Sequence, residues 1–267
     1  TFNSEDKIHQ CLASIESKIK VIIIENSSNS NLKNELEKKY SNVRCILTGQ
    51  NLGYAKGNNL GLSKVKSKYA LVLNPDTILD NNALDQFIST ANKVLDFAII
   101  GPAKQDEYCK EDLNKNKEQV FQVNTIKGFA MFLNLEQFSR IGFFDENFFI
   151  YLEEIDLCLR LKKDNKKIFL DKKIIVHHIG GSSHNDKINF EMELSRNWHW
   201  MWSIFYFNKK HYGYLYALKT VSKKLFSSLF KIFFYTIIFN INKKKIYSQR
   251  FSGLYNSIIG KNSWYRP

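Results

Sequence analysis

Short apolar runs alternate with longer mixed segments along the first part of the chain. Each run has the length and the polar borders of a buried strand. The segments between them are rich in helix formers, and Ser or Asn is available as an N-cap ahead of the first one. The predicted strands are VIII (21–24), RCILTG (44–49), YALVLN (69–74) and FAIIGP (97–102), and the predicted helical segments are 28–40, 51–67 and 81–95. Strands that alternate with helices predict an α/β domain with a mostly parallel sheet.

Polar residues directly after the predicted strands are the first candidates for a site. In open α/β sheets ligands bind beyond the carboxyl ends of the strands. Glu25 and Asn26 follow the first strand, and Asn74 and Asp76 follow the third, across a turn fixed by Pro75. Asp76 could hold Mg²⁺ or Mn²⁺, which prefer oxygen ligands and often bridge to phosphates. The alternative is that Asp76 only stabilises its turn or caps the helix that begins near residue 81.

Two further segments have the composition of phosphate-binding turns. NLGYAKGNN (51–59) could let the backbone approach a nucleotide, with Lys56 offsetting phosphate charge, but it matches neither GxGxxG nor the Walker pattern and could be only a turn. KKIIVHHIGGSSH (172–184) predicts a strand that places His177 and His178 on opposite faces, so at most one serves the site of Asp76. A lone strand histidine is often structural. The following GGSS could offer backbone N–H groups to phosphate oxygens.

The stretch YLEEIDLCLR (151–160) gathers carboxylates on a predicted helix. Glu153, Asp156 and Arg160 would share one face, because side chains three and four positions apart are neighbours, whereas Glu154 points about a quarter-turn away. The stretch is either an ion-paired helix or a catalytic carboxylate beside its supports. Farther upstream, the charged and aperiodic segment 104–120 predicts an exposed loop.

Charge divides the chain into two parts. The net charge is +13, yet residues 195–267 hold 13 Lys and Arg and no Asp or Glu, which leaves 26 basic and 26 acidic residues in the first 194. A uniformly basic nucleic-acid binder would not show this division. The four cysteines are scattered without a CxxC pair, which is typical of reduced thiols in a cytosolic protein rather than of a disulfide framework or a zinc site.

The basic part contains a nearly apolar run, LFSSLFKIFFYTIIFNI (225–241), interrupted by Lys231. A membrane-spanning helix needs about 20 residues. Flanking lysine clusters and many aromatic residues favour a helix that lies on an anionic membrane surface. A true span, or a helix packed on the catalytic domain or on a second subunit, remain alternatives. The aromatic residues ahead of the run are Trp198, Trp200, Trp202, Tyr206, Tyr212, Tyr214 and Tyr216.

Seven motifs in a fixed order resemble a known enzyme family. They are TFNS, CLASI, VIIIENSS, NLGYAKGNNLG, ALVLNPDT, KGFAMFLNLEQFSRIGFFDENFFIYLEEIDLCLRL and HHIGGSS. The series is similar to glycosyltransferase family 2, and most to the rhamnosyltransferase-like branch of its inverting, GT-A-fold members, over residues 1–184. The resemblance implies a catalytic domain at 1–194 with a Rossmann-like sheet flanked by helices, and a C-terminal helical extension at 195–267. It also implies that the family's first strand is nearly absent from this sequence, and hence that the sequence is truncated at its start.

The resemblance assigns roles to individual residues. Glu154 would be the general base, and Asp76 and His178 would hold the Mn²⁺ or Mg²⁺ ion, with Asn74 at a position where many relatives have a second carboxylate. Relatives usually have Asp where Glu154 and Glu25 stand. The expected nucleotide-sugar contacts are Thr1, Asn3, Glu25, Asn26, Asn51, Gly53, Lys56, Gly57, Asn59, Asn74 and Asp76. The expected supporting or acceptor-side residues are Gly128, Asp145, Glu153, Asp156 and Arg160.

The resemblance also implies substrates and a location. The leading donor is dTDP-L-rhamnose, and the leading acceptor is a saccharide, lipid-linked, in O-antigen or capsule synthesis. A UDP-hexose, UDP-N-acetylhexosamine or UDP-galactofuranose donor is the alternative, as is a non-catalytic nucleotide-sugar-binding module, given Glu at positions 25 and 154. The expected location is cytoplasmic, peripheral to the inner face of the cell membrane, as a possible homo-oligomer that does not bind nucleic acid.

Overall fold

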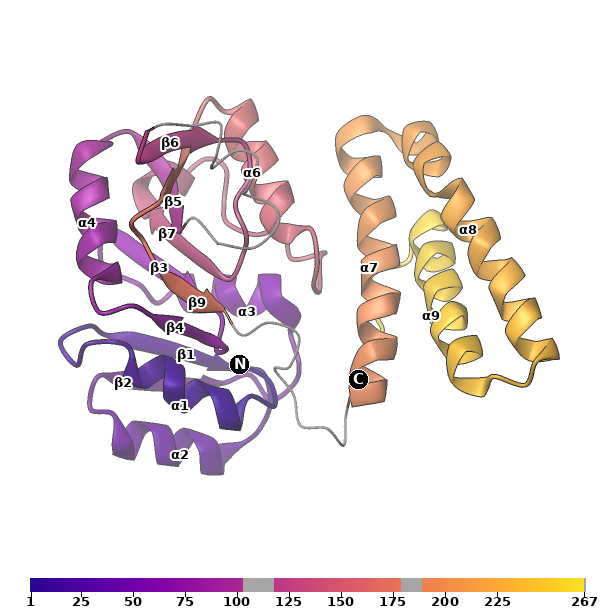
Figure 1. Cartoon of the computed structure of the whole chain (residues 1–267), viewed down its shortest axis with the longest axis horizontal. Coiled ribbons are helices and arrows are strands. Elements are labelled where there is room, and N and C mark those ends of the chain that lie inside the picture. The colour runs from indigo at the N-terminus through magenta and orange to yellow at the C-terminus, as the bar shows by residue number, and fades with distance from the viewer. Residues whose placement is uncertain (103–117, 179–188, 267) are drawn as a thin grey trace. The chain divides into compact units, whose positions relative to one another are not determined.

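The computed structural model describes residues 1–102, 118–178 and 189–266 (Figure 1). The chain divides into two compact units. We call them the sheet unit, formed by Thr1–Asn51, Gly57–Phe144 and Glu154–His184, and the helical unit, formed by Leu52–Lys56, Asp145–Glu153 and Asn185–Pro267. The predicted boundary after residue 194 falls inside helix α7 (Asn189–Tyr212), and the assignment of catalysis to 1–194 stays a prediction.

The sheet unit contains three groups of paired strands. Strand β1 pairs with β2 in parallel, and β4 pairs with β9 antiparallel. The five-stranded sheet has the order β3-β7-β5-β8-β6. The strands are β1 (Val21–Glu25), β2 (Val43–Leu47), β3 (Tyr69–Leu73), β4 (Thr77–Leu79), β5 (Phe97–Pro102), β6 (Val120–Val123), β7 (Ala130–Asn134), β8 (Lys167–Asp171) and β9 (Val176–His178). The helices are α1 (Glu5–Ala13), α2 (Ser30–Lys39), α3 (Gly53–Leu62, which begins in the helical unit), α4 (Ala83–Lys93), the 3₁₀ helix η1 (Leu135–Phe138) and α6 (Glu153–Lys163).

The α/β class is confirmed, but the five-stranded sheet is mixed, which corrects the expectation of a mostly parallel sheet. Only the pair β5–β8 is parallel within it. Strand β7, which the sequence patterns did not single out, lies between β3 and β5 and is antiparallel to both. The direction differs from expectation because an apolar run reports that a strand is buried and carries no signal for its direction.

Local sequence explains where the first elements begin and end. The side chain of Asn29 accepts a hydrogen bond from the Leu32 amide at 3.0 Å, so the predicted N-cap of α2 is confirmed. Every residue of β5 is buried, as the unbroken apolar run FAIIGP predicts. Helices α1 and α2 bury Leu12, Leu32 and Leu36 against the apolar residues of β1 and β2. This packing fixes the end of β1, where the first candidate site residues lie.

The helical unit is built on three long helices, α7, α8 (Tyr214–Ile237) and α9 (Ile241–Ile258) (Figure 1). Helices α7 and α9 approach closely at Gly253, where an added Cβ would lie 2.2 Å from the Trp198 carbonyl oxygen. Segment 145–153 joins this unit through the Ser203 hydroxyl, which donates to the Ile150 carbonyl at 3.0 Å, and through Phe149 stacked on His199. Burial lowers the pKa of His199 to about 3, so its imidazole is neutral in the fold.

The apolar run 225–241 is not one helix. Helix α8 ends at Ile237, and α9 begins at Ile241 after a short turn. None of the helices among the described residues is long and apolar enough to cross a membrane.

Some predictions fall on residues outside the described ranges. Of the predicted loop 104–120, residues 104–117 lie outside, and strand β6 begins at Val120. Cys109 lies outside the described residues, and so does the GGSS turn that follows His178. The cysteines within them, Cys11, Cys45 and Cys158, are buried free thiols, in agreement with the sequence prediction for those three.

Candidate active site

The carboxylate of Glu25 lies at the end of β1 and is held from two sides. The Ser27 hydroxyl donates to Oε1 at 2.6 Å, and the Thr1 hydroxyl donates to Oε2. The Thr1 nitrogen donates a hydrogen bond to the Ile24 carbonyl at 2.7 Å, and the Thr1 carbonyl accepts one from the Asn26 amide at 2.8 Å. This is the hydrogen-bond pattern of a parallel strand pair in which Thr1 lies opposite Glu25. The structure thus brings Thr1, Glu25 and Asn26 together.

Helix α3 approaches β1 through glycines. An added Cβ at Gly57 would lie 3.1 Å from Nδ2 of Asn26, and one at Gly61 would lie 3.3 Å from Cγ1 of Ile24. Gly57 therefore keeps α3 close to the buried Asn26. Asn59, two residues farther along α3, donates from Nδ2 to the Phe144 carbonyl at 2.8 Å and accepts at Oδ1 from the Phe144 amide at 3.0 Å. In this structure Asn59 is a positioning residue, and its contact with a nucleotide sugar stays a prediction.

The buried carboxylate of Asp76 contacts His178. Asp76 follows Pro75 in a turn in which the Asn74 carbonyl accepts from the Thr77 amide at 3.3 Å and from the Thr77 hydroxyl at 2.7 Å. Thr77 is paired with His178 between β4 and β9, and His178 Nε2 lies 3.4 Å from Asp76 Oδ1. The structure therefore brings the two predicted metal ligands together.

The surroundings keep Asp76 ionised. Burial raises the pKa of this carboxyl, but the hydrogen bond and charge of His178, its own backbone amide and the charge of Lys7 outweigh burial, so the pKa lies below its ordinary value. The His178 ring stacks on Phe129, with ring centroids 4.9 Å apart, whereas His177 is exposed on the other face. Asp76 does not cap α4, because the N-cap position is taken by Asn82.

The donor atoms of Asp76 and His178 fit a divalent cation that is shared with a substrate. A carboxylate oxygen suits Mg²⁺ or Mn²⁺, and an imidazole nitrogen suits transition metals. Among the residues that the structure describes, no group of three or more His, Cys, Asp or Glu side chains could hold a metal. Two such side chains leave coordination positions for phosphate oxygens and water, which is the manner in which Mg²⁺ is usually bound at substrate phosphates.

Glu154 lies in the first turn of α6, where helix N–H groups favour negative charge. Burial raises the pKa of the Glu154 carboxyl, and the backbone amides of Glu154 and Ile155 and the charge of Lys127 offset only part of this increase. Directly before α6, Tyr151 and Leu152 have φ angles of 73° and 70°. Two successive bulky residues in the left-handed region are uncommon, and such backbone strain clusters at functional sites.

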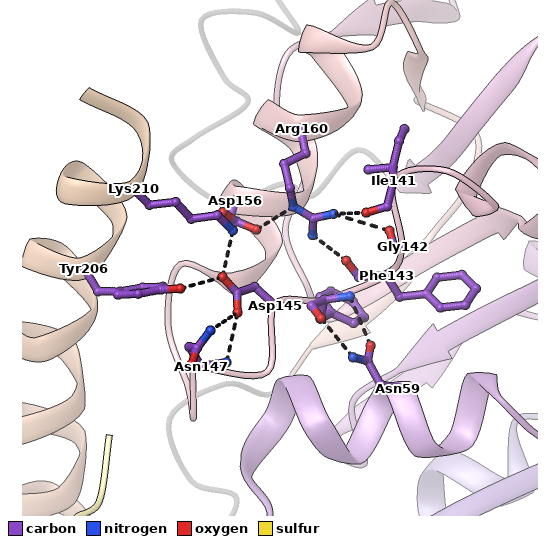
Figure 2. Close-up of polar contacts among 11 residues, drawn as sticks. Asn59, Ile141, Gly142, Phe143, Asp145, Asn147, Asp156, Arg160, Tyr206 and Lys210 are labelled. Atoms are coloured by element: carbon purple, nitrogen blue, oxygen red, sulfur yellow. Dashed lines mark hydrogen bonds and ion pairs between the residues drawn. The ribbon is translucent and has the colours of Figure 1, made fainter. Parts of the chain in front are cut away.

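Arg160 holds the loop that precedes segment 145–153. Its Nε donates to the fully buried Asp156 at 2.7 Å, so the predicted i,i+4 ion pair is confirmed. Its two other nitrogens donate to the carbonyls of Ile141 at 2.9 Å and of Phe143 (Figure 2). Asp156 and Arg160 therefore position the 141–143 loop within the sheet unit.

Asp145 is an anchor inside the helical unit (Figure 2). It accepts hydrogen bonds from the Tyr206 hydroxyl at 2.9 Å, from Lys210 Nζ at 2.7 Å and from the Asn147 amide at 3.0 Å. Burial raises the pKa of Asp145, but these donors outweigh it and keep the pKa below its ordinary value. Its contacts link segment 145–153 to helix α7.

The remaining candidates divide between the two units. Gly53 belongs to the helical unit, where its φ is +80° and an added Cβ would lie 2.3 Å from the Phe149 carbonyl oxygen. Lys56 is exposed and Glu153 is buried in the same unit. Asn3, Asn51 and Gly128 lie in the sheet unit and are partly exposed. Whether these residues contact a substrate stays a prediction.

Sequence reasoning missed several residues that contact the candidates. Ser27 fixes Glu25, Phe129 stacks on His178, and Lys127 places its charge near Glu154. Lys127 and Phe129 flank Gly128 in the KGFAMF motif, so this motif was the available signal. In the helical unit Trp200, which is 40% exposed, meets the Tyr151 ring edge-on at 5.4 Å. No pattern in the sequence paired these two rings.

Comparison with known proteins identifies the family. The family model described as Glycosyl transferase family 2 matches residues 1–160, more than half of the chain. The chain belongs to glycosyl transferase family 2. The resemblance of the sequence motifs to this family is thereby confirmed over the matched residues.

Curated relatives of this family 2 chain are similar at low identity. The low-salt glycan biosynthesis hexosyltransferase Agl10 of Haloferax volcanii is 25% identical over 190 residues, which cover 62% of this chain and 61% of that protein. The chain thus spans less than two thirds of that relative. The N-acetylglucosaminyl-diphospho-decaprenol L-rhamnosyltransferase of Mycobacterium tuberculosis is 21% identical over 237 residues, with coverage of 70% of this chain and 76% of that one.

A solved structure supports the fold. The mannosyltransferase PcManGT from Pyrobaculum calidifontis, in complex with GDP-Man and Mn²⁺, superposes with a TM-score of 0.60 at 10% identity, over 97% of this chain and 85% of that one. At this identity the likeness concerns the fold alone, and it confirms the GT-A architecture for this family 2 chain.

Proposed function

We propose that the chain is an inverting glycosyltransferase that moves L-rhamnose from dTDP-L-rhamnose to a saccharide carried on a lipid diphosphate. The buried Asp76–His178 contact carries this proposal, because it offers two metal-ligand atoms at the end of a strand pair in a family 2 fold. The name of the mycobacterial relative, which gives L-rhamnose as the transferred sugar and a diphospho-decaprenol-linked N-acetylglucosamine as the acceptor, supports this sugar and this class of acceptor. A UDP-sugar donor is the alternative that the final measurement below tests.

Asp76 and His178 would hold Mn²⁺ or Mg²⁺, which supplies positive charge to the departing nucleoside diphosphate. Glu25 and Asn26 would contact the nucleotide base, with Thr1 and Ser27 keeping the Glu25 carboxylate in one orientation. Glu154 would take the proton from the acceptor hydroxyl as that oxygen attacks the anomeric carbon. One displacement on the face opposite the leaving group inverts the configuration.

The acceptor side and the location are part of the proposal. Trp200 and Tyr151 present aromatic rings on which an apolar sugar face can stack, within the helical unit. A lipid-linked acceptor, as in O-antigen or capsule synthesis, would place the enzyme at the inner face of the cell membrane. The sheet unit alone supplies the predicted metal ligands and the predicted base.

Exchange of Asp76 for Asn is expected to weaken metal-dependent nucleotide binding. The neutral amide removes one anionic ligand, so calorimetric titration of dTDP in Mn²⁺ should show affinity at least about tenfold lower than for the wild-type enzyme. Asp80→Asn is the matched control, because Asp80 is an exposed residue four positions away. Equal Mn²⁺-dependent affinity in Asp76→Asn and wild type would contradict the metal role.

The pH dependence of kcat/KM should report the raised pKa of Glu154. A general base works deprotonated, so the rate falls as pH drops through the pKa of Glu154, which lies above the value of about 4.3 for an unperturbed glutamate. Lys127→Gln removes a charge that lowers this pKa and should move the acid limb to higher pH. An acid limb that stays in place in Lys127→Gln would contradict the assignment.

A further inference from the structure

The turn between α8 and α9 lies at one end of the three-helix bundle (Figure 1), and exposed apolar side chains lie on this turn and along the outer face of α8. Phe226, Phe230, Phe233 and Ile237 are spaced four, three and four positions apart and form one outward stripe on α8. Ala217, Val221 and Ser228 are the buried residues of the opposite face. We call the following exposed set the hairpin tip: Phe226, Leu229, Phe230, Phe233, Phe234, Ile237, Ile238, Phe239 and Ile241.

The one charge within this run does not lie on the apolar stripe. Lys231 is partly buried, donates to the Tyr247 hydroxyl at 3.1 Å and places its ammonium 4.7 Å from the centre of that ring. Tyr247 belongs to α9 and stacks on Tyr235 of α8. The lysine that interrupts the run in sequence therefore faces α9, and the outward stripe is apolar from Phe226 to Ile237.

Phe239 occupies a position that folding alone does not explain. The Asn240 amide donates to the Tyr235 carbonyl at 3.0 Å and the Phe239 amide to the Thr236 carbonyl at 3.3 Å, which is a Schellman motif at the end of α8. Glycine is usual at the left-handed position of this motif, yet here Phe239 has φ 54° and is 88% exposed. A large apolar side chain is thus held outward at a strained backbone position.

Positive charge surrounds the hairpin tip. Lys243, Lys244 and Lys245 follow the turn in the first part of α9, and all three are exposed. Lys219 and Lys223 are exposed on α8, on the same face as the stripe. Residues 195–267 contain no Asp or Glu. An apolar surface flanked by exposed lysines on α8 and α9 matches a surface that is apolar inside and anionic at its face.

We propose that the hairpin tip inserts into an anionic lipid surface, with Phe239 at its apex and Lys243 to Lys245 at the level of the headgroups. This insertion specifies how the enzyme would be held at the membrane. It rests on the proposed function for the membrane location alone, and not for the chemistry of transfer. A second copy of the chain would meet the tip with the same lysines and no carboxylate from its own residues 195–267. Charge therefore favours lipid over self-association through the tip.

Flotation of the full chain with vesicles tests the insertion. Wild type should float with phosphatidylcholine vesicles that contain about one third phosphatidylglycerol, and much less with pure phosphatidylcholine. Phe230→Glu combined with Phe239→Glu should reduce vesicle-bound protein at least about tenfold. Leu215→Glu is the matched control, because Leu215 is 80% exposed on the same helix outside the tip. This control should bind as wild type does.

Two more variants separate the apolar and charged contributions. Phe239→Gly suits its left-handed position, so it should keep or raise thermal stability while it weakens vesicle binding. Changing Lys243, Lys244 and Lys245 to Gln should weaken binding by roughly fivefold per lysine and reduce its salt dependence.

The inference is overturned by any of three results. The first is wild type that stays unbound to anionic vesicles, and the second is Leu215→Glu that loses binding as fully as the tip variant. The third is a dimer, seen by sedimentation, that Phe239→Glu dissociates without vesicle binding. Nucleotide binding in Mn²⁺, measured without lipid, is expected to be unchanged in every tip variant. Failure of lipid binding is thereby distinguished from failure of the proposed transfer chemistry.

Discussion

Replacing Glu154 by glutamine is expected to lower the turnover of sugar transfer by about 10²–10⁴-fold, the usual contribution of a general base. Glutamine has nearly the size of glutamate but cannot accept the proton of the acceptor hydroxyl at neutral pH. Donor affinity should stay within about twofold of wild type, since Glu154 is assigned to the acceptor's proton and not to the donor. Single-turnover rates and calorimetric donor titration measure the two quantities separately.

Glu136→Gln provides the control for this exchange, because Glu136 is an exposed carboxylate in η1 that lies 4.0 Å from Lys68 Nζ. Its turnover should match that of wild type. If Glu154→Gln transfers sugar at the wild-type rate, Glu154 is not the base. If wild type binds a donor tightly and transfers nothing, the chain is a nucleotide-sugar-binding module.

Replacing Gly53 by alanine is expected to lower the free energy of unfolding by about 2–5 kcal/mol. Gly53 has φ +80°, and its added Cβ would lie 2.3 Å from the Phe149 carbonyl oxygen. The Tyr54 amide donates to that same oxygen at 2.7 Å, so neither segment can retreat without loss of a hydrogen bond. Thermal and denaturant unfolding of the full chain measures the change.

Gly49→Ala separates the cost of a left-handed backbone conformation from the cost of the contact with Phe149. Gly49 has φ +74°, close to that of Gly53, but its added Cβ would meet nothing within 4 Å. Gly49→Ala should therefore lower the free energy of unfolding only by the conformational penalty of about 1–2 kcal/mol. Equal losses in the two variants would show that the contact with Phe149 adds nothing.

Local patterns predicted much of the sheet unit. The apolar run FAIIGP coincides with β5, and the polar residues after VIII and YALVL lie at strand ends, as runs bounded by polar residues imply. The Asp156–Arg160 pair was predictable because helix periodicity alone brings positions four apart together. The contact of Asp76 with His178 joins residues about a hundred positions apart and was available only through the family resemblance.

Other features depend on tertiary packing and left no signal in the sequence. Asn59 was expected to contact the nucleotide sugar, and Asp145 to be a supporting or acceptor-side residue. Their side chains bond the Phe144 backbone and, for Asp145, Lys210 and Tyr206, partners that periodicity does not reveal. The end of α8 was hidden because Ile238 and Phe239 are as apolar as the helix before them, so the hydrophobic run continues through the turn. Strand direction within the five-stranded sheet was hidden because an apolar run indicates burial and carries no signal for direction.

Release of nucleoside diphosphate from a panel of dTDP-, UDP- and GDP-sugars tests whether the chain is a metal-dependent glycosyltransferase. It uses the full chain with Mn²⁺ or Mg²⁺, a membrane lipid extract as acceptor, and the Asp76→Asn and Glu154→Gln variants. We expect release from dTDP-L-rhamnose that depends on metal and acceptor and is lost in both variants. Release from a UDP-sugar instead would change the donor, and release that persists in both variants would contradict the roles of Asp76 and Glu154.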